Sequence, residues 1–195
     1  MNNVIKYLSS FLQRIAESND VFGVPLQTQK TSIFHGLTRP TISILCYMER
    51  IYKYAKCSPS CFVVAYIYID RFVQKQPLLP ITSFTVHRLL IASVLLSAKF
   101  MDDIFYNNAY YAKVGGISTA EMNLLEMDFL FGLGFQLNVS PSTFQTYSSF
   151  LQREMLLQSP PLNLPLPSAL ILALPETPHF CIKEDGTTHQ QQLAV

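Results

Sequence analysis

The sequence predicts an all-α fold in which a bundle of helices surrounds a buried central helix. Apolar residues recur at helical spacing in several segments, cap signals mark where helices start, and two segments are apolar on every side. Hydrophobic residues make up 49% of the 195 residues and charged residues 14%, which is enough apolar material for a core. A helix that is apolar all round has to be buried, so these two segments are expected at the centre.

The N-terminal segment, residues 1–20, is predicted to be an amphipathic helix, because its polar residues occupy the face opposite an apolar stripe. The members of that stripe are Val4, Ile5, Leu8, Phe11, Leu12 and Ile15. Residues 41–54 repeat the helical period after a loop-like stretch that ends at Arg39-Pro40. Both helices need a surface on which to pack their apolar faces.

The next two segments are the ones that are apolar on all sides. Ser58 as N-cap and Pro59 at the first helical position start CFVVAYIYIDRFVQ. Its β-branched residues could favour a strand, but its length and its start signal favour a helix. The second helix spans about residues 84–101. It contains the uncharged run LLIASVLLSA, residues 89–98, which Lys99 closes.

Three signals organise the rest of the predicted bundle. Asn107-Asn108 is a break before a short turn at residues 110–112. Ser118 and Glu121 have the spacing of a capping box, which opens a helix that runs to about residue 132. A second serine–proline start at Ser140-Pro141 opens the last helix.

The composition changes after residue 157. Six of the twelve prolines lie between residues 160 and 178, and a polar terminus follows. We therefore expect residues 158–195 to form a proline-rich, disordered tail. Residues 21–157 are expected to form one domain, with core helices at about 41–151.

Several classes of function are disfavoured by the sequence. The net charge is +1, and Lys and Arg form no runs, so we expect no direct contact with nucleic acid. The run between Arg88 and Lys99 is shorter than the roughly 20 apolar residues that cross a bilayer, so no membrane association is expected. No phosphate-binding, dinucleotide-binding or catalytic motif is found. We expect no enzyme activity, no cofactor and no small-molecule ligand.

A metal site is also disfavoured. Cys57 and Cys61 have a spacing that could suit zinc, but a structural zinc site needs four ligands, commonly as two close pairs. The histidines are dispersed and supply no second pair. Reduced intracellular thiols are the simpler interpretation.

Segments spread along the chain resemble the cyclin box: AYIYIDRF (65–72), LLIASVLLSAKFMDD (89–103) and STAEMNLLEMDFLFGLGFQL (118–137). Others are similar to the plant U-type, or P-type, cyclins, which are related to the yeast phosphate-response cyclins: FHG (34–36), CSPSCF (57–62) and NNAYY (107–111). The resemblance covers about residues 4–157 and implies a single cyclin box.

The resemblance also implies a function. It implies a regulatory subunit that binds and activates a cyclin-dependent serine/threonine kinase of the PSTAIRE-helix type. The process would be cell division or nutrient-linked control of the cell cycle, in the nucleus, the cytoplasm or both. A kinase adaptor that does not activate, or a cyclin-fold adaptor in transcription that binds nucleic acid, is the alternative.

By this resemblance, Lys99 and Glu126 bind the backbone around the regulatory C-helix of the kinase, and Phe100 adds an apolar contact. From the residues alone, Lys99 could equally cap its own helix and pair with Asp102 or Asp103. We expect these two carboxylates to form a solvated helix end. Further apolar contacts that the resemblance implies are Leu130, Phe135 and Leu137. Each of these could instead belong to the core.

Some features depart from the family pattern. Asp70 matches an aspartate that many cyclins pair with an arginine, but neither Arg39 nor Arg50 stands at the matching position. We therefore expect a structural role for Asp70, with an unknown partner. The chain has no tryptophan, so the tryptophan-containing patch with which cell-cycle cyclins recruit substrates is missing. A second five-helix repeat is also missing.

The tail contains two candidate phosphorylation sites, Ser159-Pro160 and Thr177-Pro178. A proline-directed kinase needs an extended and accessible chain, whereas Ser58 and Ser140 are expected to be engaged as helix caps. Each phosphate would add about −1.5 to −2 charges. We predict modification of Ser159 and Thr177 alone when the complex with its kinase is incubated with ATP. Mass spectrometry would contradict this if it located phosphate only at the caps, or none in the tail.

Overall fold

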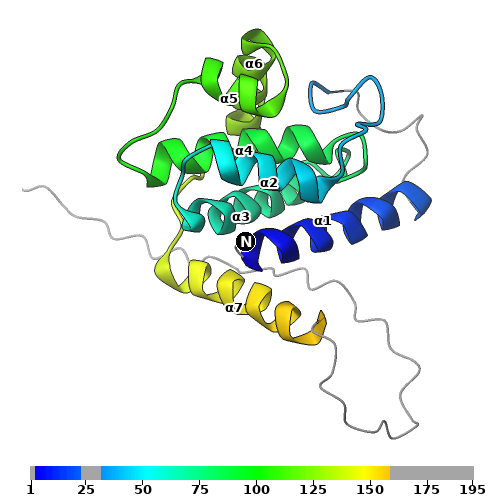
Figure 1. Ribbon diagram of the computed structural model, residues 1–195, viewed down its shortest axis with the longest axis vertical. Helices are drawn as coiled ribbons and strands as arrows, with labels where there is room; N and C mark the ends of the chain where they lie inside the picture. The colour runs from blue at the N-terminus through cyan, green and yellow to red at the C-terminus, as the bar shows by residue number, and fades with distance from the viewer. Residues whose placement is uncertain (1–2, 23–31, 159–195) are drawn as a thin grey trace, which may run out of the picture. The chain divides into compact units, whose positions relative to one another are not determined.

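The computed structural model describes residues 3–22 and 32–158, and in this part of the chain the regular secondary structure is entirely helical. The prediction of an all-α fold is confirmed. The helices are α1 (Asn3–Phe22), α2 (Ile44–Tyr54), α3 (Pro59–Lys75), α4 (Val86–Met101), α5 (Asn108–Gly115), α6 (Thr119–Leu133) and α7 (Pro141–Gln158) (Figure 1). The predicted tail, with Ser159 and Thr177, lies outside the described residues. Among the residues described, no helix is both long and apolar enough to span a bilayer.

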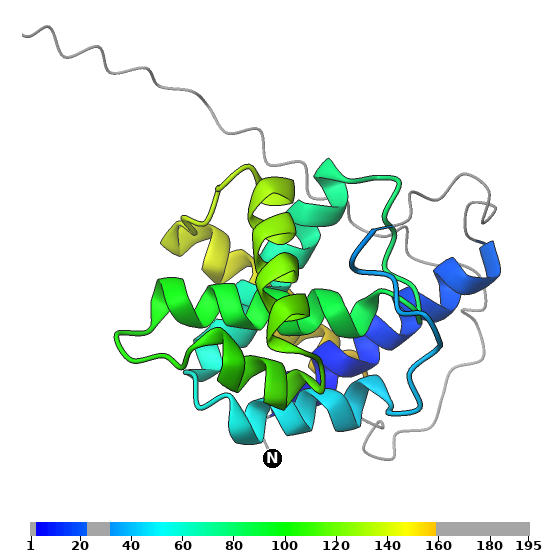
Figure 2. The same cartoon turned by 90° about the horizontal axis from the view of Figure 1, so that it is seen from above.

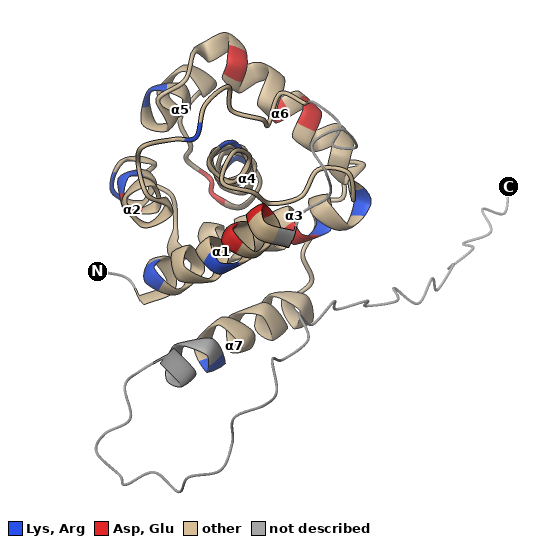
Figure 3. Cartoon of the chain, turned by 90° about the vertical axis from the view of Figure 1, so that its right-hand side faces the viewer, with Lys and Arg blue, Asp and Glu red and all other residues tan. Residues whose placement is uncertain are grey.

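Helix α4 lies at the centre of the bundle. Seen along its axis, it is surrounded by α2, α3, α5 and α6 (Figure 3), and α6 crosses over it (Figure 2). Every residue from Leu89 to Ala98 is buried, as the uncharged run predicts. The two serines in the run, Ser93 and Ser97, are fully buried, and each hydroxyl donates to the backbone carbonyl three residues earlier at 2.9 Å. The central helix therefore leaves no hydroxyl without a partner.

Helix α3 packs along α4 and is the second helix that is apolar on all sides. Its residues from Cys61 to Ile69 are all buried. Polar groups at the ends of some of its side chains bind other segments. The Tyr68 hydroxyl, for example, donates to the carbonyl of Leu137 at 2.7 Å. The predicted central pair of helices is thus α3 and α4.

Helix α1 packs on α2, α3 and α7 through one stripe of its surface. The buried members of that stripe are Ile5, Leu8, Leu12 and Ala16. The ring of Phe11 meets the rings of Tyr66 and Phe150 edge-on, with centroids 5.6 Å apart in each case. Near the end of α1, the Asp20 carboxylate accepts hydrogen bonds from the backbone and hydroxyl of Ser83. The N-terminal helix is therefore an integral part of the bundle.

One local prediction was wrong, and another was confirmed only in part. The expected short turn at residues 110–112 is part of helix α5, which begins after Asn107 because the Asn107 side chain accepts from the Tyr110 backbone N–H at 3.0 Å. Ser58 occupies the N-cap position of α3, but its side chain makes no capping hydrogen bond. Its hydroxyl lies 3.3 Å from the sulfur of Cys61 instead. The capping box of Ser118 and Glu121 is present.

Asp70, whose partner could not be assigned from the sequence, binds residues other than arginine. One of its carboxylate oxygens accepts from the Tyr147 hydroxyl of α7 and, at 2.8 Å, from the side-chain amide of Gln74. Burial, followed by this hydrogen bond and the nearby negative charge, raises the pKa of Tyr147 above its ordinary value. Asp70 therefore joins α3 to α7.

Helices α3 and α6 pack so closely at Gly132 that no larger residue fits there without a shift. A Cβ at Gly132 would lie 2.1 Å from the ring of Phe72. The Phe72 ring in turn stacks on Phe129, with centroids 4.6 Å apart and planes 9° apart, and meets Phe34 at 5.1 Å. Glycine at position 132 thus lets the two helices approach closely around these three rings.

The packing of α1 predicts that Leu12→Ala lowers the free energy of unfolding by about 2–5 kcal/mol, because it leaves a cavity where Leu12 is fully buried. Urea denaturation followed by circular dichroism measures the loss. The exposed residue Lys6 on the same helix provides the control, since Lys6→Ala should stay within about 0.5 kcal/mol. Equal stabilities of the two variants would mean that α1 does not contribute to the core.

Gly132→Ala should lower the free energy of unfolding by about 1–3 kcal/mol, because the new methyl group overlaps the Phe72 ring. In an ordinary helix interior the same change would stabilise by about 0.5–1 kcal/mol. A double-mutant cycle with Phe72→Leu identifies the cause, because a smaller side chain relieves the overlap. If the cost of Gly132→Ala is the same in both backgrounds, the ring contact is not its origin.

Candidate functional site

Lys99 and Glu126, which lie far apart in the sequence, form an ion pair in the structure. The Lys99 Nζ atom lies 2.6 Å from Oε1 of Glu126, and the two side chains are 28% and 17% exposed. The other oxygen of Glu126, Oε2, accepts from the side-chain amide of Asn108 at 2.6 Å. We call Lys99, Glu126 and Asn108 the Lys99 cluster. It joins the last turn of α4, the middle of α6 and the first residue of α5.

The local sequence explains why these three side chains meet. Lys99 is the first charged residue after the buried run of α4, so its ammonium group emerges where that helix leaves the core. Glu126 lies on α6, which the Ser118 capping box starts. Asn108 also donates to Asn123, one turn before Glu126, at 2.8 Å. The alternative pairing of Lys99 with Asp102 or Asp103 is not the one observed.

Asp102 was expected to be a solvated carboxylate at the end of a helix, and this prediction was wrong because it is hydrogen-bonded to residues of another segment. Its Oδ2 atom accepts from the backbone N–H of Ser58 at 2.9 Å and from the Cys61 thiol at 3.4 Å. Partial burial acts to raise the pKa of Asp102, but the hydrogen bonds from Ser58 and Cys61 outweigh it and hold the pKa below its ordinary value. The residue that follows α4 is thereby tied to the start of α3.

Exposed apolar residues flank the Lys99 cluster along the chain, and we call them the apolar margin. On the end of α4 and the loop after it, they are Phe100, Met101, Ile104 and Phe105. On and just after α6, they are Leu124, Met127, Phe131 and Phe135. Phe100 is 49% exposed and Phe135 60% exposed. Side chains of this size are seldom left in water without a partner when several occur together.

Helix α6 carries two apolar stripes, and only one of them faces the core. The buried stripe is Met122, Leu125, Phe129 and Leu133. The exposed stripe of Leu124, Met127 and Phe131 has the same helical spacing and belongs to the apolar margin. A surface helix normally presents polar residues on its outer face. The second stripe is therefore a candidate surface for contact with a partner.

Phe135 is held in an uncommon backbone conformation. Its φ is +60°, in the left-handed region, directly after Gly134 at φ +61°. For a residue with a side chain this conformation costs about 1–2 kcal/mol. Its ring meets that of Phe131 edge-on at 5.3 Å, and its backbone N–H donates to Leu130. The ring that follows α6 in this conformation is largely exposed.

Side chains of α3 hold the segment that follows α6. Arg71 donates to the carbonyls of Gln136 and Asn138 at 3.1 and 2.9 Å. Lys75 donates to the carbonyl of Leu133 at 2.7 Å and to the Gln136 side chain at 2.6 Å. These bonds, with that from Tyr68, fix the backbone on both sides of Phe135.

The other apolar positions implied by the resemblance are less exposed. Leu130 and Leu137 are partly buried and pack against the core. They therefore offer less apolar surface than Phe100 and Phe135. Some members of the Lys99 cluster and the apolar margin were not identified from the sequence. They are Asn108, Met101, Ile104, Phe105, Leu124, Met127 and Phe131. The signal in the sequence was the i, i+3, i+7 spacing of Leu124, Met127 and Phe131. It marks a second apolar stripe on α6, in addition to the stripe that fills the core.

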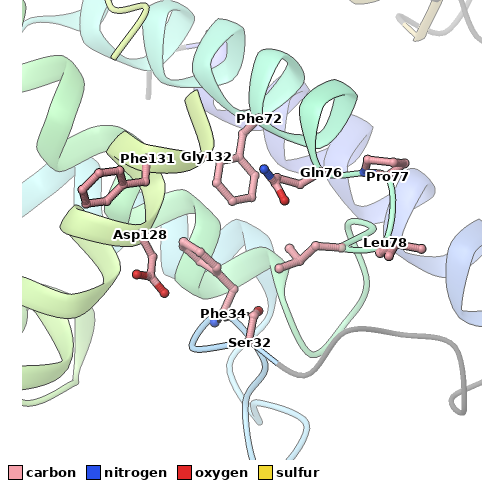
Figure 4. A pocket seen from close by; sticks show the side chains of 10 residues that line it. Ser32, Phe34, Phe72, Gln76, Pro77, Leu78, Asp128, Phe131 and Gly132 are labelled. Carbon is pink, nitrogen blue, oxygen red and sulfur yellow. Dashed lines mark hydrogen bonds between the residues drawn. The ribbon is translucent and has the colours of Figure 1, made fainter. Parts of the chain in front are cut away.

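A pocket of about 420 Å³ adjoins the apolar margin at Phe131. It lies between the ends of α3 and α6 and the segment around Phe34 (Figure 4). Its walls are largely apolar, and the polar side chains among the lining residues are Ser32, Gln76 and Asp128 (Figure 4). A single carboxylate offers no acid–base pair, so the pocket extends the apolar surface and does not suggest a catalytic centre.

Comparison with known proteins assigns the chain to a family. The sequence model described as Cyclin matches residues 2–137. Cyclin-U4-1 of Arabidopsis thaliana is 59% identical over 200 residues, which cover 100% of this chain and 96% of that protein. Cyclin-U4-2 of the same plant is 64% identical over 160 residues, covering 82% of this chain and 74% of that protein.

A relative from a second plant agrees. Cyclin-P4-1 of Oryza sativa subsp. japonica is 56% identical over 168 residues, covering 83% of this chain and 79% of that protein. The helical fold and the family match lead to the same assignment. The chain belongs to the cyclin family, whose members are non-catalytic regulatory subunits of cyclin-dependent kinases, and within it to the plant U- and P-type cyclins.

Proposed function

We propose that the chain binds and activates a cyclin-dependent kinase of the PSTAIRE-helix type through the Lys99 cluster and the apolar margin. The observation that carries this proposal is the ion pair of Lys99 and Glu126, with exposed Phe100 next to Lys99 in the chain and exposed Phe135 just after the helix of Glu126. Charged groups held in place among apolar side chains suit a partner that offers both backbone polar groups and apolar side chains.

The ion pair prepares both side chains for such a partner. A Lys ammonium has three donors, of which Glu126 takes one, so two remain for backbone carbonyls of the kinase. The carboxylate of Glu126 is held at both oxygens and has lone pairs left for backbone N–H groups. Because these long side chains are already ordered, less conformational entropy is lost on binding.

The apolar margin would supply most of the contact area. Aromatic residues are enriched at the buried centres of interfaces, and Phe100, Phe131 and Phe135 are exposed rings of the apolar margin. Leu130 and Leu137 are partly buried against the core, so they would contribute less contact area.

Activation would follow from preferential binding to one kinase conformation. An active kinase needs its β3 lysine paired with the C-helix glutamate and its activation segment ordered. A partner that binds only the inward position of the C-helix shifts the equilibrium toward it by its differential affinity. The process we propose is cell division or nutrient-linked control of the cell cycle, in the nucleus, the cytoplasm or both.

Lys99→Glu should remove kinase binding, because it places a carboxylate beside Glu126 and opposite backbone carbonyls. The expected cost is about 2–5 kcal/mol of affinity. Binding is measured with purified plant cyclin-dependent kinases, and phosphorylation of a substrate peptide separates an activator from a passive adaptor. Circular dichroism should show unchanged helix content.

Two further variants make this test specific. Lys113→Glu, at an exposed lysine of α5 outside the cluster, should bind normally. The exchange Lys99→Glu with Glu126→Lys restores an ion pair but reverses both charges, so it should fold and still fail to bind. If the exchange variant binds like the original protein, the pair only stabilises the fold. If Lys99→Glu itself binds normally, the proposed site is wrong.

A further inference from the structure

Basic residues gather where α2 and α5 run side by side. Arg50 and Lys53 are on α2, Lys113 is on α5, and Lys56 follows α2 in the chain. Figure 3 shows basic residues on both helices. Glu49 is the one acidic residue of α2, and α5 has none. Within the part of the chain that the structure describes, no carboxylate forms an ion pair with any of these cations. The face therefore keeps a net positive charge.

Tyrosine rings hold three of these cations in place. The pairs, with the distance from the cation to the ring centroid, are Arg50 and Tyr47 at 5.1 Å, Lys53 and Tyr54 at 5.1 Å, and Lys56 and Tyr106 at 5.8 Å. A ring attracts a cation through its negative face and accepts no conventional hydrogen bond from it. The cations are thus positioned, but their positive charge is not neutralised.

Arg50 is the most firmly held of the four. The Tyr47 hydroxyl donates to the carbonyl of Gly115 at 3.2 Å, which fixes the ring beside the guanidinium. A Cβ at Gly116 would lie 3.1 Å from Nη2 of Arg50, so the missing side chain there leaves room for the guanidinium. The Nε atom of Arg50 is buried without a hydrogen-bond partner among the described residues. Charged groups removed from water normally have a partner. Arg50 is therefore a fixed, partly buried cation that lacks its own anion.

The contacts between the two helices bring both lysines near Arg50. The Tyr110 hydroxyl of α5 donates to the carbonyl of Tyr54 at 2.8 Å, at the opposite end of the contact from Tyr47 and Gly115. Lys53 lies one turn after Arg50 on α2. Lys113 lies one turn before the glycine that the guanidinium covers, on the same side of α5. Both lysines are exposed.

We propose that Arg50, Lys53 and Lys113 form a binding site for a phosphorylated segment of a partner protein. The planar guanidinium of Arg50 can donate paired hydrogen bonds to phosphate oxygens, and the lysines act as point charges toward a second phosphate. Each phosphate brings about −1.5 to −2 charges, more than a carboxylate, which suits a face with several uncompensated cations. Lys56 is left out of the site, because the loop of its partner ring Tyr106 also carries Asp103.

The arrangement of the rings favours a phosphorylated peptide over nucleic acid. Proteins that bind single-stranded nucleic acid offer free aromatic faces on which bases stack. Here the rings of Tyr47 and Tyr54 are occupied by the protein's own cations. The site is also separate from the one proposed for the kinase, because none of its residues belongs to the Lys99 cluster or the apolar margin. It therefore does not rest on the proposed function.

The test uses the full-length protein and a fluorescein-labelled peptide of glycine and serine that carries two phosphoserines. Fluorescence anisotropy at physiological salt should detect binding of this peptide, and no binding of the same peptide without phosphate. Binding should weaken at high salt, because exposed charges are screened. In two-dimensional NMR spectra, the phosphorylated peptide should shift the amide signal of Gly116, which lies beside the guanidinium.

Three variants locate the binding. Arg50→Gln should lower the affinity for the phosphorylated peptide about tenfold, because it removes charge-assisted hydrogen bonds. Lys53→Gln should lower it several-fold, and because Lys53 is exposed, this variant keeps the test decisive if Arg50→Gln does not fold. Arg153→Gln, at an exposed arginine of α7, is the matched control and should bind like the original protein. Circular dichroism checks that each variant is folded.

Each of the following outcomes would overturn the proposal. Equal binding of the peptides with and without phosphate means that phosphate is not recognised. An equal loss of affinity in the variants at positions 50 and 153 means that the peptide responds to overall charge and not to a site. Displacement of the peptide by the same concentration of inorganic phosphate means a site for a small anion. An oligothymidylate that binds more tightly and displaces the peptide means that the face recognises nucleic acid.

Discussion

The burial of ten consecutive uncharged residues in α4, Leu89–Ala98, is the constraint on which the rest of the structure depends. A helix buried all round needs neighbours on every side, and α2, α3, α5 and α6 supply them. The run also determines where charge can reappear. Lys99 is the first side chain after the run that is partly exposed, so the end of the run places a cation beside Glu126 of α6.

The second organising feature is the set of polar groups at the far end of α3. Tyr68, Arg71 and Lys75 bind the backbone between residues 133 and 138. They satisfy the carbonyls that the end of α6 and the following loop would otherwise leave unpaired. They also hold the strained backbone at Phe135, so the packing of one helix fixes an aromatic side chain on another.

Local signals and periodicity were enough to predict much of the fold. The uncharged run predicted the central helix, and the capping-box spacing predicted the start of α6. The expectations for Ser58 and Asp102 failed where a long-range contact decided the outcome. The N-terminus of α3 has Asp102, 44 residues away, as its acceptor, so the Ser58 hydroxyl was not needed as a cap. The partner of Asp70 is Tyr147, which lies 77 residues away. The spacing of residues along the sequence cannot predict a contact of this kind.

The site was predictable only in part for the same reason. Resemblance singled out Lys99 and Glu126, and the structure pairs them directly. Their third partner, Asn108, could not be identified before α5 was placed, because the sequence suggested a break and a turn there. The exposed stripe of α6 has the periodicity of a core stripe. Its residues could therefore be recognised as surface only when Met122, Leu125 and Phe129 were seen to fill the core.

The Lys99 cluster draws its members from three helices, with Glu126 27 residues from Lys99 and 18 from Asn108. The complete cluster cannot form until α4, α5 and α6 have docked. A nascent or misfolded chain in which these three helices have not docked therefore lacks the complete cluster, even if its individual helices form. Unfinished molecules would not compete with mature ones for the kinase, so assembly of the complex would itself verify that folding is complete.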